Sequence, residues 1–288
     1  MTDRICLHRR GLTPEQLAPL LEISRGQLYH APNSTWIVHE NPIEASSLEP
    51  FEAALNCDIN PIPHDFDWRN IKLVLSDMDS TLINIECIDE IADLHGIKAE
   101  ISAITESAMQ GRLDFVEALC RRVALLKGVS LDCLEQVYRE RLRLNPGAQQ
   151  LIQELKRRSI PFSLVSGGFT FFTDRLQQQF GLYASKANVL EIAQGHLTGK
   201  LHGKLVDANG KAEFLREICA QLAIDPAATL VIGDGANDLK MLSIAGLSVA
   251  YRAKPQVQAA AQIRLDRSGL DALCDLFCDP LPIHTADE

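Results

Sequence analysis

Two carboxylates, Asp77 and Asp79, stand together after an apolar run at residues 71–75. Such a run is typical of a buried parallel strand, and open α/β sheets bind ligands at the carboxyl ends of their strands. In a continued strand, residues two apart point to one face. Close carboxylates repel unless a cation or a proton separates them, and Mg²⁺ prefers oxygen ligands. The pair therefore indicates a magnesium site or an aspartate nucleophile, with a solvated acidic turn as the alternative.

Two further apolar runs end in polar groups. The run at residues 160–165 leads into Ser166 and Gly167, where a hydroxyl and free backbone N–H groups meet the start of a helix and can bind an anion. Taken alone, this pattern is more often a tight turn. The run at residues 229–233 ends at Asp234. Such groups at several strand ends are far less expected by chance than any one of them.

Three more polar residues extend this set. Asn237 and Asp238 open the helix that follows Asp234, and Lys211 stands at the start of a helix predicted over residues 212–222. A lone lysine in such a place is usually solvated. Lys211 is a candidate because it belongs to a set of charged groups that all lie near strand ends.

From residue 70 onward, helical and strand patterns alternate, which predicts an α/β fold with a doubly wound, mainly parallel sheet. Residues 182–206 read as a hairpin, and residues 247–251 and 263–265 read as the last strands. We assign this catalytic core, a Rossmann-type sheet, to residues 70–83 and 145–288.

The first two strands of this core are unusually far apart. A strand–helix–strand unit needs about 30 residues, so about 60 residues are inserted between Asp77 and Ser166. Apolar residues recur at helical spacing through residues 84–144. We expect these residues to form a helical-bundle cap, a lid over the strand ends.

Residues 1–65 read as a small separate α+β module. Strand-like segments at residues 4–8, 27–31 and 35–39 alternate with a helix after Thr13 and a second one at residues 48–55. This order is compatible with a ferredoxin-like, regulatory module. No residue in the module has a catalytic pattern. Residues 60–68, which carry two prolines, read as the linker to the core.

The composition limits the partners of the chain. The 288 residues carry 38 acidic and 28 basic side chains, a formal net charge of −10, and no lysine- or arginine-rich run. Nucleic acid and anionic membranes are therefore poor partners. No apolar run approaches the roughly 18 residues of a membrane span, and the first residues lack a signal-peptide pattern. Eight cysteines without metal spacing read as buried thiols, so we expect a reduced, cytoplasmic protein.

The polar strand ends together resemble the haloacid dehalogenase superfamily of phosphatases. The first motif stands as Asp77-Met-Asp79-Ser-Thr81, the second is Ser166, the third Lys211, and the fourth Gly233-Asp-Gly-Ala-Asn-Asp238. Residues 77–86, 108–115, 122–126, 165–169 and 231–238 resemble the phosphoserine phosphatases in particular. The resemblance covers about residues 70–270. Lysine at position 204, where bacterial relatives often have an acid, is a small departure, and Lys211 rather than Lys204 is assigned by its spacing to the following helix.

The resemblance implies that Asp77 is the nucleophile and forms an aspartyl-phosphate. It implies that Asp79 is the general acid and base, which protonates the leaving oxygen and then activates water. Mg²⁺ is the implied cofactor, held by Asp77, the backbone carbonyl of Asp79 and Asp234.

Other residues take roles around the phosphoryl group. Ser166, the Gly167 N–H and Lys211 would bind its oxygens, and Asn237 would contact the substrate. Asp238 would orient Lys211 or a metal-bound water. Thr81, the last residue of the first motif, is a supporting residue.

The cap would select the substrate. Phe115 and Arg122 are seven residues apart, about two helical turns, so they share a face, and Arg122 can bind a carboxylate bidentately. Glu86 can pair with an ammonium group, and Met109 is a further implied contact. Together they imply a small-molecule substrate, O-phospho-L-serine, hydrolysed to L-serine and phosphate as the last step of serine biosynthesis. A surface salt bridge is the alternative for Arg122, and a homodimer is compatible with the family.

Two other functions share parts of this pattern. A relative that passes the phosphoryl group to an acceptor such as homoserine would have similar motifs. A phosphorylated signalling receiver also uses an aspartate and magnesium. The receiver is disfavoured by Asp79 and the long insert, since a receiver must keep its acyl-phosphate rather than hydrolyse it.

Overall fold

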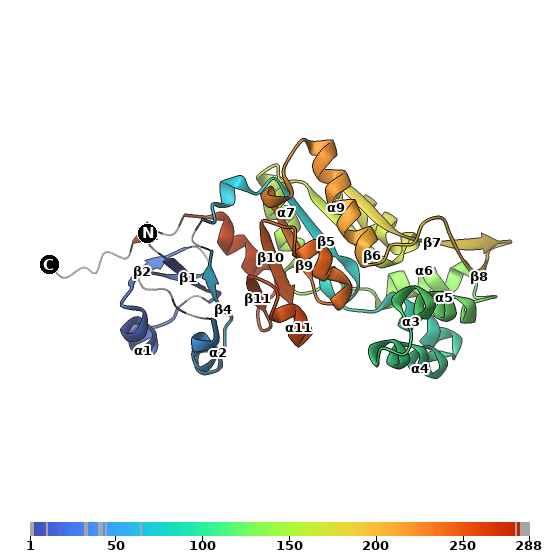
Figure 1. The fold of residues 1–288 in the computed structure, drawn as a ribbon, viewed down its shortest axis with the longest axis horizontal. Coiled ribbons are helices and arrows are strands. Elements are labelled where there is room, and N and C mark those ends of the chain that lie inside the picture. The colour runs from blue at the N-terminus through green and yellow to red at the C-terminus, as the bar shows by residue number, and fades with distance from the viewer. Residues whose placement is uncertain are drawn as a thin grey trace.

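The computed structural model describes residues 3–9, 11–31, 34–39, 43, 45–63, 65–279 and 281–282. They form two sheets, one of seven strands and one of five (Figure 1). Among these residues, no helix is both long enough and apolar enough to cross a bilayer.

The seven-stranded sheet has the order β11-β10-β9-β5-β6-β7-β8. Its strands are β5 (Leu73–Asp77), β6 (Phe162–Phe169), β7 (Ala184–Ala193), β8 (His196–His202), β9 (Thr229–Gly233), β10 (Leu247–Tyr251) and β11 (Ile263–Leu265). Neighbouring strands are parallel except β7 and β8, which form an antiparallel hairpin. The prediction of a doubly wound, mainly parallel sheet with a hairpin in residues 182–206 is confirmed.

Alternate residues of β5 pack against different layers. Leu73 and Leu75 belong to the core under one set of helices, and Val74 to the core on the opposite face. The first set is α9 (Ala208–Leu222), α10 (Leu239–Leu242) and α11 (Pro255–Gln258). The second is α7 (Ala148–Arg157), α8 (Thr170–Phe180) and the helical segment η7 (Leu270–Phe277). Short helical turns lie at η2 (Trp68–Asn70), η3 (Met78–Leu82), η5 (Pro226–Ala228) and η6 (Ala236–Asp238).

Helix α9 begins earlier than the sequence pattern predicts, at Ala208 rather than at residue 212. The cause is Asp207, whose carboxylate accepts the backbone N–H of Gly210 at 2.8 Å and so caps the helix. Lys211 therefore lies inside the first turns of α9, where its side chain is fully buried.

The residues inserted between β5 and α7 are mainly helical, as predicted. They form α3 (Cys87–His95), α4 (Lys98–Met109), α5 (Phe115–Leu125), α6 (Leu131–Gln136) and the turn η4 (Val137–Arg141). Figure 1 shows them at the far end of the molecule from the N-terminal sheet. The β7–β8 hairpin contacts them, because Gly128 N–H bonds to the Leu197 carbonyl at 2.8 Å and Leu131 N–H to the Gly195 carbonyl at 3.0 Å.

The five-stranded sheet contains β1 (Asp3–Leu7), β2 (Gln27–His30), β3 (Thr35–His39), β4 (Ile59–Ile62) and β12 (Leu281–Pro282). Strands β4-β1-β3-β2 pair antiparallel, and the chain adds α1 (Pro14–Ser24), η1 (Ala45–Leu48) and α2 (Glu49–Leu55). The predicted β-α-β-β-α order is present, and β4 closes it as a sixth element. The connection expected over residues 32–34 lies partly outside the described residues.

The reading of residues 60–68 as a linker is wrong at its start. Asn60, Pro61 and Ile62 belong to β4, which pairs with β1. Strand β4 is an edge of this sheet, where a proline without an N–H is tolerated. The same strand contacts β11 of the large sheet, since the Asn60 side chain bonds both backbone groups of Arg264 at 2.9 and 2.8 Å.

Candidate active site

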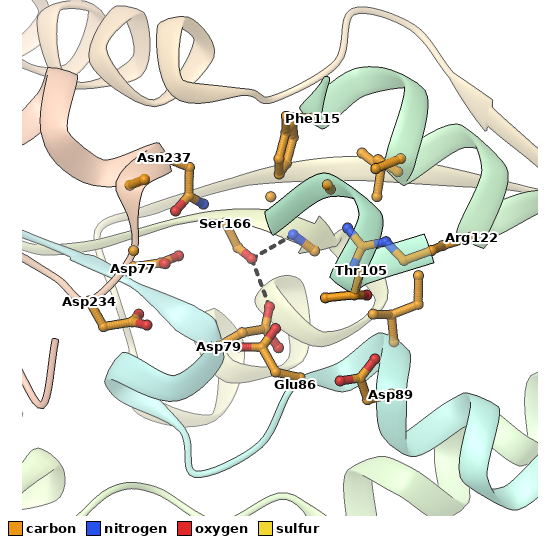
Figure 2. Close-up of a pocket in the computed structure, with 18 of the residues that line it drawn as sticks. Asp77, Asp79, Glu86, Asp89, Thr105, Phe115, Arg122, Ser166, Asp234 and Asn237 are labelled. Atoms are coloured by element: carbon orange, nitrogen blue, oxygen red, sulfur yellow. Dashed lines mark hydrogen bonds between the residues drawn. The ribbon is translucent and has the colours of Figure 1, made fainter. Parts of the chain in front are cut away.

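A pocket of about 430 Å³ lies between the carboxyl ends of the parallel strands and the inserted helices. Its strand-end side holds Asp77, Ser166 and Asp234, and its helical side holds Phe115 and Arg122 (Figure 2). The structure therefore brings together residues that are up to 157 positions apart in the sequence.

Asp77 is the last residue of β5 and is nearly fully buried. Its Oδ1 accepts the Met78 N–H at 2.7 Å and pairs with Lys211 Nζ at 2.7 Å. Among the described residues, every hydrogen bond and ion pair found for this carboxylate falls on Oδ1. The carboxylate is thus held by one oxygen, and the residue lines the pocket.

Lys211 also pairs with Asp238, Nζ to Oδ1, at 2.7 Å. Burial opposes the charge of Lys211, but Asp238 and Asp77 outweigh it and raise the pKa of the lysine. The other oxygen of Asp238 accepts the N–H groups of Asp234 and Gly235 at 3.1 and 3.0 Å. Lys204, the other lysine considered, is exposed and pairs with Glu213.

Asp79 has two partners that fix its carboxylate. Oδ1 accepts the Cys87 N–H at 2.8 Å, and Oδ2 accepts the Ser166 hydroxyl at 3.1 Å (Figure 2). Ser166 Oγ in turn accepts the Gly168 N–H at 2.7 Å. A Cβ on Gly168 would lie 2.6 Å from Asp79 Oδ2, so glycine is required there. Burial raises the pKa of Asp79, and the bonds from Cys87 and Ser166 partly offset this.

The loop that follows β5 is fixed by buried side chains. Ser80 has a left-handed backbone with φ of 57°. The amide of Asn145 donates to the carbonyls of Ser80, Thr81 and Ile83 at 3.3, 2.9 and 2.9 Å. The Thr81 hydroxyl donates to Asp234 Oδ1 at 2.7 Å. These hydrogen bonds hold together the two points where the chain enters and leaves the inserted helices, near Ile83 and Asn145.

The donor set here fits a divalent cation. Asp77, Asp234 and Asp238 each offer a carboxylate oxygen within 4.8 Å of the others. Burial and Asp238 raise the pKa of Asp77, and burial raises that of Asp234 to about 6, so the cluster is short of positive charge. The Asp79 carboxylate is directed to Cys87 and Ser166 instead, which leaves its backbone carbonyl for the predicted ligand role.

The helical side of the pocket has fewer internal contacts. Arg122 is half-buried, and its Nε is buried without a hydrogen-bond partner among the described residues. Burial lowers the pKa of Arg122, against the opposing effect of Asp89. Glu86 accepts the Ser80 hydroxyl at 2.7 Å. Glu86 keeps some contact with solvent. Its partial burial in the pocket and the negative charge of the neighbouring Asp79 raise its pKa to about 7.

Phe115, at the start of α5, closes the pocket over Gly167. A Cβ on Gly167 would lie 3.0 Å from Phe115 Cζ, so the two residues approach as closely as a glycine permits. The buried Asn188 fixes this strand end, because it donates to the Gly167 carbonyl at 2.8 Å and accepts the Val206 N–H at 2.8 Å.

Most residues predicted for the site line this pocket, namely Asp77, Asp79, Glu86, Phe115, Arg122, Ser166, Gly167, Asp234 and Asn237. Three predicted residues do not line the pocket but contact residues that do. Lys211 pairs with Asp77 and with Asp238, and Thr81 donates to Asp234. Met109 lies in α4, and its side chain is outside what the structure describes. Among the lining residues that the sequence reading missed, three have polar or charged side chains, Asp89, Thr105 and Lys254. Asp89, one helical turn after Glu86, carried a signal, but acids are common in the first turn of a helix.

Comparison with known proteins places this site in a family. A haloacid dehalogenase-like hydrolase family model matches residues 71–246. A phosphoserine phosphatase of Polaromonas sp. is 49% identical over 234 residues, which covers 80% of this chain and 99% of the relative. The phosphoserine phosphatase of Haemophilus influenzae is 47% identical, covering 84% of this chain and 79% of the relative.

Among solved structures, a probable phosphoserine phosphatase from Vibrio cholerae in unliganded form superposes with a TM-score of 0.83 at 36% identity. The match covers 96% of this chain and 86% of that one. The family model and the relatives cover the strand ends, the inserted helices and the pocket between them. The chain belongs to the haloacid dehalogenase-like hydrolases and, within them, to the phosphoserine phosphatase family.

Proposed function

We propose that this chain is a Mg²⁺-dependent phosphatase that hydrolyses O-phospho-L-serine to L-serine and phosphate through an aspartyl-phosphate at Asp77. The observation that carries the proposal is a pocket with a buried carboxylate, Asp77, at one end and an incompletely paired arginine, Arg122, at the other. The first end suits a phosphoryl group and the second a carboxylate. The relatives support the same substrate.

The phosphoryl group would meet Asp77 at the bottom of the pocket. Phosphoryl transfer needs mainly positioning and charge stabilisation. Lys211 lies 2.7 Å from Asp77 and keeps its charge through Asp238, so it can neutralise both the carboxylate and the incoming phosphoryl oxygens. Ser166 and Gly167 line the same pocket, and the hydroxyl of the first and the backbone N–H of the second would donate to those oxygens.

Asp77, the Asp79 carbonyl and Asp234 would hold the cation, and Thr81 would orient Asp234 through its 2.7 Å hydrogen bond. When bound, Mg²⁺ supplies positive charge that offsets the charge developing on the transferred group. Asp238 would position both Lys211 and Asp234, because its carboxylate accepts hydrogen bonds from the Lys211 ammonium and from the Asp234 backbone N–H.

Asp79 would move the protons. Its raised pKa favours the protonated form needed to give a proton to the leaving serine oxygen. Bonds from Cys87 and Ser166 fix its carboxylate beside the phosphoryl position, so the same group can then take a proton from the attacking water. Asp79 would thus donate a proton in the first step and accept one in the second.

The cap would recognise the amino-acid part of the substrate. Arg122 presents a guanidinium whose Nε has no partner among the described residues, and a carboxylate would complete it. Glu86 also lines the pocket and would pair with the ammonium group of the substrate (Figure 2). Phe115, which lies close to Gly167, would cover the substrate. Serine biosynthesis and a cytoplasmic location follow as parts of the same proposal.

The test is phosphate release from a panel of phosphate monoesters, with and without Mg²⁺. Phosphoserine should be the preferred substrate, and chelation of Mg²⁺ should abolish turnover. Homoserine added to the assay should leave the rate of free phosphate release unchanged. A product phosphorylated on homoserine would show that the chain is a transferase instead.

A further inference from the structure

A second group of metal-ligating side chains lies far from the pocket, between the N-terminal sheet and the C-terminal helical segment η7. Cys6 Sγ, His8 Nδ1 and one oxygen of Asp275 all lie within 4.8 Å of one another. Cys6 lies in β1, and His8 directly follows the last residue of that strand. Asp275 comes from η7, 267 residues later. The group thus joins the N-terminal sheet to η7.

The distances between these atoms suit a tetrahedral zinc site. Cys6 Sγ lies 3.8 Å from His8 Nδ1, and His8 Nδ1 lies 3.2 Å from Asp275 Oδ2. Zinc bonds of about 2.3 Å to sulfur and about 2.0–2.1 Å to nitrogen and oxygen at tetrahedral angles separate sulfur and nitrogen by about 3.6 Å, and nitrogen and oxygen by about 3.3 Å. The two separations at His8 therefore match those of a shared cation, and the Cys6 sulfur and the Asp275 oxygen, within 4.8 Å of each other, would approach to about 3.6 Å.

The surroundings are those of a closed site. The Cys6 and His8 side chains have no solvent exposure, and Asp275 is 4% exposed. His8 Nε2 is buried and has no hydrogen-bond partner among the described residues, so the ring is held through its Nδ1 edge, where Cys6 and Asp275 lie. A second thiol is at hand, because Cys278 Sγ donates to the Asp275 carbonyl at 3.0 Å.

We propose that Cys6, His8 and Asp275 form a structural site for Zn²⁺ that ties the N-terminal sheet to the C-terminal segment. A soft thiolate and an imidazole favour zinc over the magnesium expected in the active site. Binding breaks the S–H bond of Cys6, forms a sulfur–zinc bond and releases the proton to solvent. The neutral His8 ring then carries its proton on Nε2. The site is independent of the proposed phosphatase function.

The test uses the full chain, stripped of metal and kept reduced, and titrates it with Co²⁺. The expected result is a thiolate-to-cobalt absorption that saturates at one equivalent and disappears when Zn²⁺ is added. Cys6→Ser should abolish the absorption. His8→Gln and Asp275→Asn should lower the Zn²⁺ affinity by at least about tenfold, the minimum expected when a ligand is lost.

Matched controls use the same residue types elsewhere. Cys120→Ser and His196→Gln change exposed residues and should leave the absorption unchanged. Asp234→Asn disrupts the active-site cluster, which offers only oxygen ligands, and should leave it unchanged as well. Zn²⁺ should raise the unfolding temperature of the unaltered chain and have no such effect on His8→Gln.

Two results would overturn the proposal. One is the lack of thiolate–cobalt absorption in the unaltered chain, which would mean that the group is a hydrogen-bonded thiol, imidazole and carboxylate. The other is an absorption that persists in Cys6→Ser, which would place the thiolate elsewhere. Should Cys6→Ser fail to fold, the unaltered chain and His8→Gln still decide, because circular dichroism shows whether each is folded.

Discussion

At the strand-end side of the pocket, Asp77, Asp79 and Asp238 are each held by at least two contacts, to backbone N–H groups, to Lys211 or to the Ser166 hydroxyl. On the helical side, Arg122 keeps a buried Nε without a partner among the described residues. The first region is already organised before any ligand arrives. The second has polar groups that a ligand would complete, so the two should respond differently to substitution.

The difference between the two sides of the pocket corresponds to a division between phosphoryl transfer and substrate recognition in the proposed function. In the proposed function, groups on the strand-end side would act on the phosphoryl group, which every phosphate monoester carries. Groups on the helical side would act on the amino acid, which only the preferred substrate carries. Substitutions on the first side should therefore lower activity toward all substrates equally, and those on the second should lower it selectively.

The largest effect is expected for Asp77→Asn. The amide cannot attack phosphorus, so turnover should fall by at least about 10⁴-fold, as when a covalent nucleophile is removed in other enzymes. Phosphoserine and an aryl phosphate should lose activity alike. Steady-state assays with both substrates and circular dichroism check the result, with Asp65→Asn, an exposed aspartate, as the control.

Near-unaltered turnover in Asp77→Asn would refute the aspartyl-phosphate mechanism. A loss confined to phosphoserine would move Asp77 to the selecting side of the pocket and remove the distinction between the two regions.

The next effect is expected for Arg122→Ala. Removing the guanidinium leaves the substrate carboxylate unpaired in a closed site, which costs about 2–5 kcal/mol. At about 1.4 kcal/mol per decade, kcat/KM for phosphoserine should fall roughly 30-fold to several thousandfold. An aryl phosphate lacks the carboxylate and should change far less.

Arg121 provides the matched control for Arg122. It is the adjacent residue, but it is exposed and pairs with Glu117 at 2.5 Å. Arg121→Ala should leave both substrates within about twofold, since exposed ion pairs contribute little. Equal losses on both substrates in Arg122→Ala would contradict the selecting role and leave a phosphatase of another substrate.

A smaller, pH-dependent effect is expected at Glu86. Its pKa is raised to about 7, so the carboxyl is neutral below that pH and charged above it. Because only the charged form pairs with an ammonium, kcat/KM for phosphoserine should rise with pH through about 7. Glu86→Gln should lose about 10–100-fold at high pH, the cost of about 1.5–3 kcal/mol for a hydrogen bond to a charged group, and less at low pH.

Measured pH profiles for both substrates check this prediction. The aryl phosphate profile should be the same in Glu86→Gln and in the unaltered chain. A phosphoserine profile that keeps its rise near pH 7 in Glu86→Gln would assign that rise to another group, such as Asp234, whose pKa is raised to about 6.

Three groups on the strand-end side, Asp77, Ser166 and Asp234, could be predicted from the sequence because each directly follows an apolar run. The parallel sheet then brings the strand ends together. The burial of Lys211 was not predictable from periodicity, since it depends on the Asp207 cap that starts α9 earlier. Asn145 carried no functional signal in the sequence, although its amide holds the loop after β5.

The helical side was less predictable. Asp89 and Thr105 come from two helices, α3 and α4, and line the pocket only because those helices pack against each other. Helix packing depends on side-chain contacts distant in sequence, and a periodic pattern gives only the face that is buried. The pairing of β4 was missed for a similar reason, since Pro61 is acceptable only on an edge strand.

The smallest effect on activity is expected outside both regions, at Asn60 on β4. Its amide bonds the N–H and the carbonyl of Arg264 on β11 and is 3% exposed. Asn60→Ala should destabilise the chain by about 1–3 kcal/mol for each backbone group left unsatisfied. No residue of the N-terminal sheet lines the pocket, so kcat/KM should stay within about twofold for both substrates. Denaturant unfolding with parallel assays checks this, and Gln27→Ala, an exposed amide on β2, is the control. Lower activity in folded Asn60→Ala would show that the N-terminal sheet acts on the site, and the contrast between the two sides of the pocket would then have to include it.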